Sequence, residues 1–161
     1  MIQKLSKNNS KYDKANINLK VAIVRSNYYP DLTKNLEKAC KENLISYGVK
    51  KRNIRTFEVP GSWEIPLLVK KLALSKSFDG IVAFGVIIKG ETYHFEMIAN
   101  ECAGALMNIS LEFNIPVTFE VLATLNYEQA KQRSVGKTNR GIEAAKSLIE
   151  TIRVLSKLKK S

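Results

Sequence analysis

The strongest constraint on the fold is a change of hydrophobic periodicity in the middle of the chain. Residues 80–88 are apolar without interruption and rich in β-branched side chains, which is typical of a strand buried on both faces. After His94, apolar residues recur at three- and four-residue steps from Ile98 to Ile109, as on one face of a helix. The sequence therefore predicts a strand, a short loop and a helix, with His94, the single histidine, at the junction.

The same alternation of strand and helix patterns fills the rest of the chain. Strands are expected at residues 21–24, 54–59, 80–88 and 116–122, and the later helices at 62–76, 127–134 and about 139–157. Four β–α units predict an α/β fold: a single-domain three-layer αβα sandwich around a four-stranded parallel sheet with right-handed crossovers. We also expect a short N-terminal edge strand at residues 17–19, and a first helix that Asp31 or Thr33 caps and that ends at Gly48.

The chain length favours one folded unit with an added segment at its start. A chain of 161 residues holds one domain with a core of its own and is too short for two typical domains. Residues 1–16 are polar and basic and lack periodicity, so we expect a flexible arm there and one domain over residues 17–158.

The charge and the cysteines bound the class of protein. The net charge is +11, but we find no nucleic-acid-reading motif, so we favour a solvated lysine-rich surface over a nucleic-acid partner. No apolar run has the length of a membrane span, and no secretory leader is evident. Cys40 and Cys102 occupy apolar helix positions, as small core residues do in a reducing compartment. We therefore expect a cytoplasmic protein without membrane, metal or nucleic-acid partners.

The loop between residue 88 and His94 is a candidate anion site. It holds a lysine, a glycine, an acid and a threonine, and it leads into the N-terminus of the predicted helix. Unpaired N–H groups and the helix dipole at such a terminus favour phosphate. The alternative is a plain βα turn with a solvated surface histidine.

Other candidate residues are expected to gather at the same edge of the sheet, because βα loops of parallel strands share that edge. Aromatic rings there suit a flat heterocycle, an arginine suits phosphate, and an imidazole suits proton transfer. Each residue also has a purely structural alternative. The rings of Trp63 and Phe119 suit core packing, while Glu64 suits the first turn of a helix and Arg133 suits a solvated helix end. In chain order the candidates are Tyr28, Ser62, Trp63, Glu64, His94, Phe119 and Arg133.

Two long motifs then resemble a known family. The segment from Val59 to Pro66, VPGSWEIP, and the segment from Gly85 to His94, GVIIKGETYH, are similar to motifs of the 6,7-dimethyl-8-ribityllumazine synthases. Shorter similarities follow in the same order, at residues 128–130 and 139–143, and the whole resemblance spans about residues 17–155.

The resemblance implies a reaction and an assembly. Members of this family are transferases of riboflavin biosynthesis that condense 5-amino-6-(D-ribitylamino)uracil with 3,4-dihydroxy-2-butanone 4-phosphate, without a metal or organic cofactor. They are cytoplasmic homopentamers, some of which assemble into icosahedral capsids. In them the positions of Phe119 and Arg133 reach the site of the neighbouring subunit.

The resemblance also implies a role for each matching residue. His94 is the expected proton-transfer catalyst. Glu91, Thr92 and Arg133 are expected to bind the butanone phosphate, and Arg140 and Glu143 to support them. The expected contacts of the ribitylaminouracil are Tyr28, Ser62, Trp63, Glu64, Val86, Ile87, Ile88 and Phe119.

Several positions depart from the family pattern. Tyr28 replaces a more frequent Phe or Trp, Tyr93 replaces a small residue, and Glu120 replaces a usual glycine, which leaves its charge unexplained. The connection at residues 134–138 is one residue short, which favours shell assembly. Two other functions are open: a carrier that binds a lumazine or flavin without turnover, and a binder of acidic partners.

Overall fold

The computed structural model describes residues 18–158 and has a four-stranded parallel sheet at its centre. The strands are β1 (Val21–Ser26), β2 (Ile54–Val59), β3 (Gly80–Ile88) and β4 (Val117–Thr124), in the order β2-β1-β3-β4. The predicted αβα sandwich and its parallel sheet are confirmed. In register, Val21 lies opposite both Ile54 and Gly80, and Ile81 lies opposite Val117.

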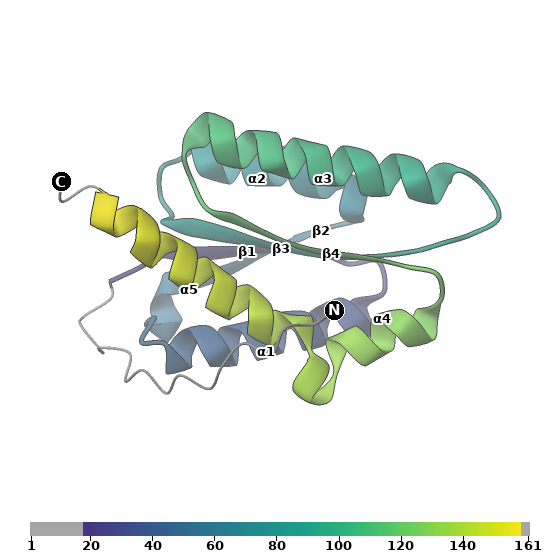
Figure 1. The fold of residues 1–161 in the computed structure, drawn as a ribbon, viewed down its shortest axis with the longest axis horizontal. Helices are drawn as coiled ribbons and strands as arrows, with labels where there is room; N and C mark the ends of the chain where they lie inside the picture. Colours follow the sequence, from purple (N-terminus) through teal and green to yellow (C-terminus); the bar gives the residue numbers. More distant parts are fainter. Residues whose placement is uncertain (1–17, 159–161) are drawn as a thin grey trace.

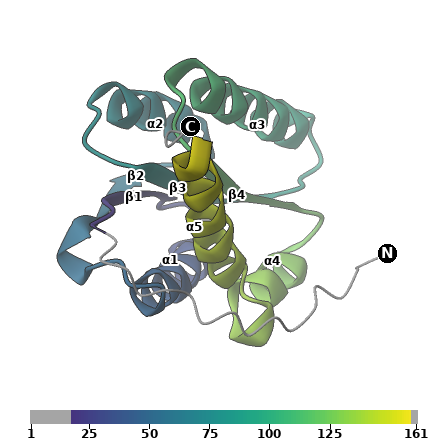
Figure 2. The same ribbon diagram turned by 60° about the vertical axis from the view of Figure 1, so that its left-hand side comes forward.

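Helices cover both faces of the sheet. Helices α2 (Ile65–Leu74) and α3 (His94–Phe113) lie on one face, and α1 (Pro30–Ser46), α4 (Tyr127–Ser134) and α5 (Arg140–Leu158) lie on the other (Figures 1 and 2). Residues 18–158 also contain three short 3₁₀ turns: η1 (Lys51–Asn53), η2 (Ser62–Glu64) and η3 (Gly136–Thr138). The connection from β1 therefore runs on one face and the connection from β3 on the other, so the two strands flank a topological switch point.

Apolar layers on the two faces hold the sandwich together. On one side Leu36 and Leu44 of α1 pack with Leu148 and Ile149 of α5, and all four are fully buried. The layer on the other side includes Ile65, Val69, Cys102, Leu106 and Ile109 from α2 and α3. Burying one such aliphatic side chain is worth about 1.5–3 kcal/mol, so these layers fix how the helices sit on the sheet.

Gly141 permits an unusually close approach of two helices. A Cβ at this position would lie 2.1 Å from the carbonyl oxygen of Leu36 in α1. The Asn139 side chain secures the same junction, because its amide donates to the Ser134 and Asn35 carbonyls and its oxygen accepts from the Gly141 N–H. The start of α5 is therefore locked against α1 and the end of α4.

Two local predictions need correction. Residues 18–20 do not form the expected edge strand, and residue 17 lies outside the described residues; the backbone N–H of Lys20 instead donates to the Asp79 carboxylate at 2.7 Å. Neither Asp31 nor Thr33 caps α1: the N-cap is Tyr29, and the Thr33 hydroxyl donates to the Ser26 carbonyl. Pro30 at the first helical position has no backbone N–H, so one fewer donor needs a cap there.

Two helix ends are set by asparagines, and the two cysteines lie in the core as expected. The Asn126 side chain caps α4 by accepting from the Gln129 N–H, and Asn114 ends α3 in the left-handed conformation. Cys40 and Cys102 are free and buried. Within residues 18–158, no helix is long and apolar enough to cross a bilayer.

Candidate active site

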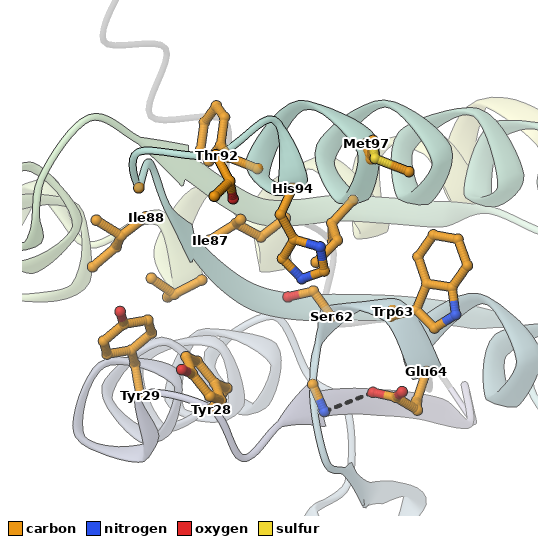
Figure 3. Close-up of a pocket in the computed structure, with 15 residues that line it drawn as sticks. Tyr28, Tyr29, Ser62, Trp63, Glu64, Ile87, Ile88, Thr92, His94 and Met97 are labelled. Carbon is orange, nitrogen blue, oxygen red and sulfur yellow. Dashed lines mark hydrogen bonds between the residues drawn. The ribbon is translucent and has the colours of Figure 1, made fainter.

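One cavity opens at the carboxyl ends of β1, β2 and β3. Its volume is about 650 Å³, and the loops that follow these three strands line it. Figure 3 shows the aromatic rings of Tyr28 and Tyr29 on one side, Trp63 on another, and the imidazole of His94 between them. The walls are thus apolar and aromatic, with a few polar groups that converge on the same space, as in typical small-molecule sites.

Most of the predicted site residues line this cavity. It includes Tyr28, Ser62, Trp63, Glu64, Val86, Ile87, Ile88, Thr92 and His94. The remaining predicted residues are Glu91, Phe119, Arg133, Arg140 and Glu143, and they do not line it within the single chain. The side chains around the cavity also leave much aromatic surface in contact with solvent: Tyr28 is 63% exposed and Trp63 is 58% exposed.

A buried ionic network fixes the end of β1, just before Tyr28. The Arg25 guanidinium is almost fully buried, donates to Glu37 at 2.7 Å and also pairs with Glu58 of β2. Burial by itself raises the pKa of Glu37, but the hydrogen bonds from Lys41 and Thr56 and the charge of Arg25 outweigh it and hold that pKa below its ordinary value. Glu37 is therefore ionised at neutral pH and ties β1 to α1 and β2.

The turn η2 brings a hydroxyl and a carboxylate to the cavity. Glu64 accepts from the Gly61 N–H at 2.9 Å, so part of its function is to cap its own turn (Figure 3). The Cys102 thiol approaches the Ser62 carbonyl at 3.5 Å, and burial raises the pKa of this thiol to about 11. Cys102 is accordingly a neutral packing residue under the turn.

The hydroxyl of Ser62 has no hydrogen-bond partner although it is buried. It lies against Gly85 of β3, where an added Cβ would come within 2.5 Å of the hydroxyl oxygen. In Figure 3 the His94 imidazole points toward this side chain. A buried hydroxyl without a partner is costly, so this one is poised to bond with a ligand that enters the cavity.

His94 is the first residue of α3, which begins without a side-chain cap. The preceding loop brings Gly90 and Thr92 to the cavity. An ion pair between Lys89 and Glu96 links the start of this loop to the first turn of α3. A helix of 20 residues thus presents unpaired N–H groups and a positive dipole end beside an imidazole and a hydroxyl. This combination suits a phosphate that sits next to a proton-transfer group.

The residues expected on the other side of the site have different surroundings. Arg133 is exposed, and its guanidinium donates to the Gln129 carbonyl of its own helix at 2.9 Å. Phe119 is 42% exposed on β4. Arg140 binds the buried Glu120 through two hydrogen bonds of 2.9 and 3.1 Å, which gives the unexplained acid of β4 its partner.

Sequence reasoning missed several cavity residues. Tyr29, Gly61, Gly90, Phe95, Met97 and Ile98 line it as well. Met97 and Ile98 follow His94 by three and four residues, so the helical period places them on the face that His94 occupies. That signal was present in the sequence. Tyr29 reaches the cavity through a backbone conformation that no local sequence pattern predicts.

Among the described residues, no cluster of three or more His, Cys, Asp or Glu side chains is arranged to hold a metal ion.

The chain is similar to proteins of one named family. The family profile described as 6,7-dimethyl-8-ribityllumazine synthase matches residues 18–156. A protein of that name from Ruthia magnifica subsp. Calyptogena magnifica is 43% identical over 145 residues, 86% of this chain and 87% of its own. Another from Vesicomyosocius okutanii subsp. Calyptogena okutanii is 46% identical over 136 residues, 81% of both chains. A third, from Leuconostoc mesenteroides, is 40% identical over 143 residues, 88% of this chain and 92% of its own. The chain therefore belongs to the 6,7-dimethyl-8-ribityllumazine synthase family, a family of transferases.

Proposed function

We propose that this chain condenses 5-amino-6-(D-ribitylamino)uracil with 3,4-dihydroxy-2-butanone 4-phosphate to give 6,7-dimethyl-8-ribityllumazine, phosphate and water, in the penultimate step of riboflavin biosynthesis. The observation that carries the proposal is the juxtaposition of aromatic walls, His94 and the uncapped start of α3 on one cavity, in a member of this family. The flat pyrimidine belongs between Tyr28, Trp63 and the end of β3. The phosphate belongs at the loop of Thr92.

The reaction consists of steps that each move a proton. The 5-amino group of the uracil attacks the ketone and loses water, which forms an imine. Elimination of phosphate gives an enol, the enol tautomerises to a ketone, and the ribitylamino nitrogen attacks this carbonyl with loss of a second water. His94 is placed to give and take these protons, because an imidazole ring can act as a general acid and as a general base. No step needs a cofactor.

Phosphate departure needs positive charge, and Arg133 is our candidate for it. Arg133 does not line the cavity of its own chain, and neither do Phe119, Glu91 or the supporting residues Arg140 and Glu143. We propose a homo-oligomer, a pentamer or a shell of pentamers, in which Arg133 and Phe119 complete the cavity of a neighbouring copy. The exposed rings at the cavity and the exposed Phe119 support an assembly that covers them.

Two further proposals concern the rest of the chain. Residues 17–158 form the catalytic domain, to which the basic residues 1–16 are an added arm. The enzyme works in the cytoplasm, a location that the two free, buried cysteines support because reducing compartments keep thiols unpaired.

The proposal is tested by mixing the purified protein with both substrates. We expect the absorbance and fluorescence of the lumazine to appear together with one equivalent of inorganic phosphate. A folded protein that releases neither product contradicts the proposal. If such a protein still binds the lumazine tightly, it is a carrier rather than an enzyme.

A further inference from the structure

Tyr29 adopts a backbone conformation that its sequence context disfavours. Its φ and ψ are 56° and 60°, in the left-handed region, although it carries a side chain and precedes Pro30. A residue with a Cβ loses about 1–2 kcal/mol in this conformation, and a following proline independently favours extended backbone. Tyr29 also makes no side-chain cap for α1, the usual task of a residue at that position. Its surroundings must therefore hold it.

Aromatic rings from two different elements hold Tyr29. Its ring meets the Tyr28 ring edge-on, with 5.0 Å between ring centroids and an interplanar angle of 89°. On its other side it meets the ring of Tyr127, with 6.2 Å between centroids and a tilt of 56°. Each such pair is worth about 0.5–1.5 kcal/mol, so the two together are of the size of the backbone cost.

Tyr127 is itself anchored to α1. It is the first residue of α4, and its hydroxyl donates a hydrogen bond to the carboxylate of Asp31 in the first turn of α1. The chain of contacts runs from Asp31 to Tyr127, then to Tyr29 and Tyr28. The Tyr29 carbonyl also accepts from the backbone N–H groups of Leu32 and Thr33, both at 3.1 Å.

This chain of contacts ends on a wall of the cavity. Both Tyr28 and Tyr29 line it, and Figure 3 shows their rings side by side at its edge. Tyr28 is 63% exposed, so contacts with solvent do little to orient it, and its ring depends on the edge of Tyr29. The conformation of Tyr29 therefore sets where the Tyr28 ring stands before any ligand arrives.

From this geometry we infer that Tyr127 is a positioning residue: acting through Tyr29, it holds the Tyr28 ring in place as the wall against which the flat ring of the substrate stacks. The identity of that substrate rests on the proposed function. Tyr127 does not line the cavity, and neither motif that carries the family resemblance includes it. Its effect is pre-organisation of a binding surface, which improves affinity by lowering the ordering cost of binding.

The kinetic test compares two substitutions of Tyr127 with a matched control on the same helix. Tyr127→Ala removes the ring and should raise KM for the ribitylaminouracil about tenfold, the loss of about one aromatic pair. Its kcat and its KM for the butanone phosphate should stay within about twofold of the wild type. Tyr127→Phe keeps the ring and loses the hydrogen bond to Asp31, so KM for the ribitylaminouracil should rise about threefold. Lys131→Ala, an exposed change on α4, should have no effect.

A variant of Tyr29 tests whether Tyr127 acts on Tyr28 through the Tyr29 ring. Asparagine tolerates the left-handed conformation, so Tyr29→Asn removes the ring without forcing the backbone to move. It should raise the same KM about as much as Tyr127→Ala does, about tenfold. An unchanged KM in either Tyr29→Asn or Tyr127→Ala overturns the inference, and so does an equal rise of KM for both substrates in Tyr127→Ala.

Hydrogen exchange separates this inference from the proposed function. In the ligand-free protein, the amides of Leu32 and Thr33 should exchange faster in Tyr127→Ala than in the wild type and in Lys131→Ala, by about tenfold. If the wild type makes no lumazine, the proposed function fails while this measurement still decides whether Tyr127 holds the segment. Unchanged exchange of these amides in Tyr127→Ala overturns the positioning role.

Discussion

The ends of β1, β2 and β3 bring all their proposed site residues except Glu91 to one cavity, whereas the residues proposed from β4, α4 and α5 do not line it. The first group is close in space because neighbouring parallel strands end at the same edge of the sheet. The second group lies on β4 and on the two helices that follow it, α4 and α5. One region is thus brought together by the topology of a single chain, and our proposal is that the other becomes part of a site when a second copy lies beside it.

Two arginines show how the second region is built. Arg140 is bound to the buried Glu120, and this bond raises the pKa of the guanidinium further. Arg133 is exposed and holds one carbonyl of its own helix. Moving Arg140 would strand a buried carboxylate, while moving Arg133 breaks one exposed bond. This difference favours Arg133 over Arg140 as our candidate for the phosphate of a neighbouring copy.

Replacement of Arg133 should have the largest effect on turnover. In Arg133→Ala we expect kcat/KM for the butanone phosphate to fall about a thousandfold, because the departing phosphate loses its cation in a water-poor site. Stability should change little, since the side chain is exposed. Steady-state kinetics with the butanone phosphate as the varied substrate measures this, and an Arg133→Ala enzyme with wild-type kinetics would remove Arg133 from the mechanism.

Mixing experiments then ask whether the two regions come from different copies. Arg133→Ala and His94→Ala subunits that are unfolded together and reassembled should form some sites with both wild-type residues. For random neighbours in a ring these are about a quarter of all sites, so about a quarter of wild-type activity should return. If the mixture stays as inactive as its parts, His94 and Arg133 act on the same copy or not together.

Loss of His94 should matter less than loss of Arg133. We expect His94→Ala to lower kcat about a hundredfold with little change in KM, at the modest end of what acid–base catalysis supplies. The remaining rate comes from holding two reactive substrates together in one cavity. A folded variant that binds both substrates and gives no turnover would contradict this division of labour.

The ion pair of the second region should carry stability rather than turnover. Arg140→Ala strands the Glu120 carboxylate, which is 7% exposed, and should lower the free energy of unfolding by about 2 kcal/mol. In a Glu120→Gln background the same change should cost less than half as much, because the buried charge is gone. Urea unfolding of the four proteins in this cycle gives both values, and equal losses in the two backgrounds would show that the pair does not interact.

The pH dependence of this pair follows from Glu120. Burial raises the pKa of its carboxyl, and Arg140 lowers that pKa by a smaller amount. An acid with a raised pKa in the folded state holds its proton longer there, so it destabilises the fold as pH rises through that pKa. Without Arg140 the pKa of Glu120 is higher still, so this destabilisation is larger. The loss of unfolding free energy in Arg140→Ala should therefore be smaller at about pH 5 than at about pH 7. An equal loss at both pH values would contradict the raised pKa of Glu120.

Local signals in the sequence point to the first region more directly than to the contacts of the second. The period change at His94 and the Pro-Gly break before Ser62 are local signals, and parallel topology then placed their loops together. The partner of Glu120 lies 20 residues away on another element, and no local pattern links it to Arg140. The left-handed Tyr29 was missed for a similar reason, because the rings that hold it come from β1–α1 and α4. Capping by Asn126 was predictable because its partner Gln129 is three residues away.

Two buried serines give the smallest and most direct comparison of the regions. Ser62, at the cavity, has a hydroxyl without a partner, whereas the Ser134 hydroxyl at the end of α4 donates to the Lys131 carbonyl at 3.0 Å. Ser62→Ala should therefore raise the free energy of unfolding by about 1 kcal/mol, and Ser134→Ala should lower it by about 1 kcal/mol. With both substrates present, Ser62→Ala should also raise KM for the ribitylaminouracil about fivefold, because the hydroxyl finds its partner in the ligand. If Ser62→Ala loses stability as Ser134→Ala does, the hydroxyl is already bonded within the protein, and the cavity is no more strained than the rest of the fold.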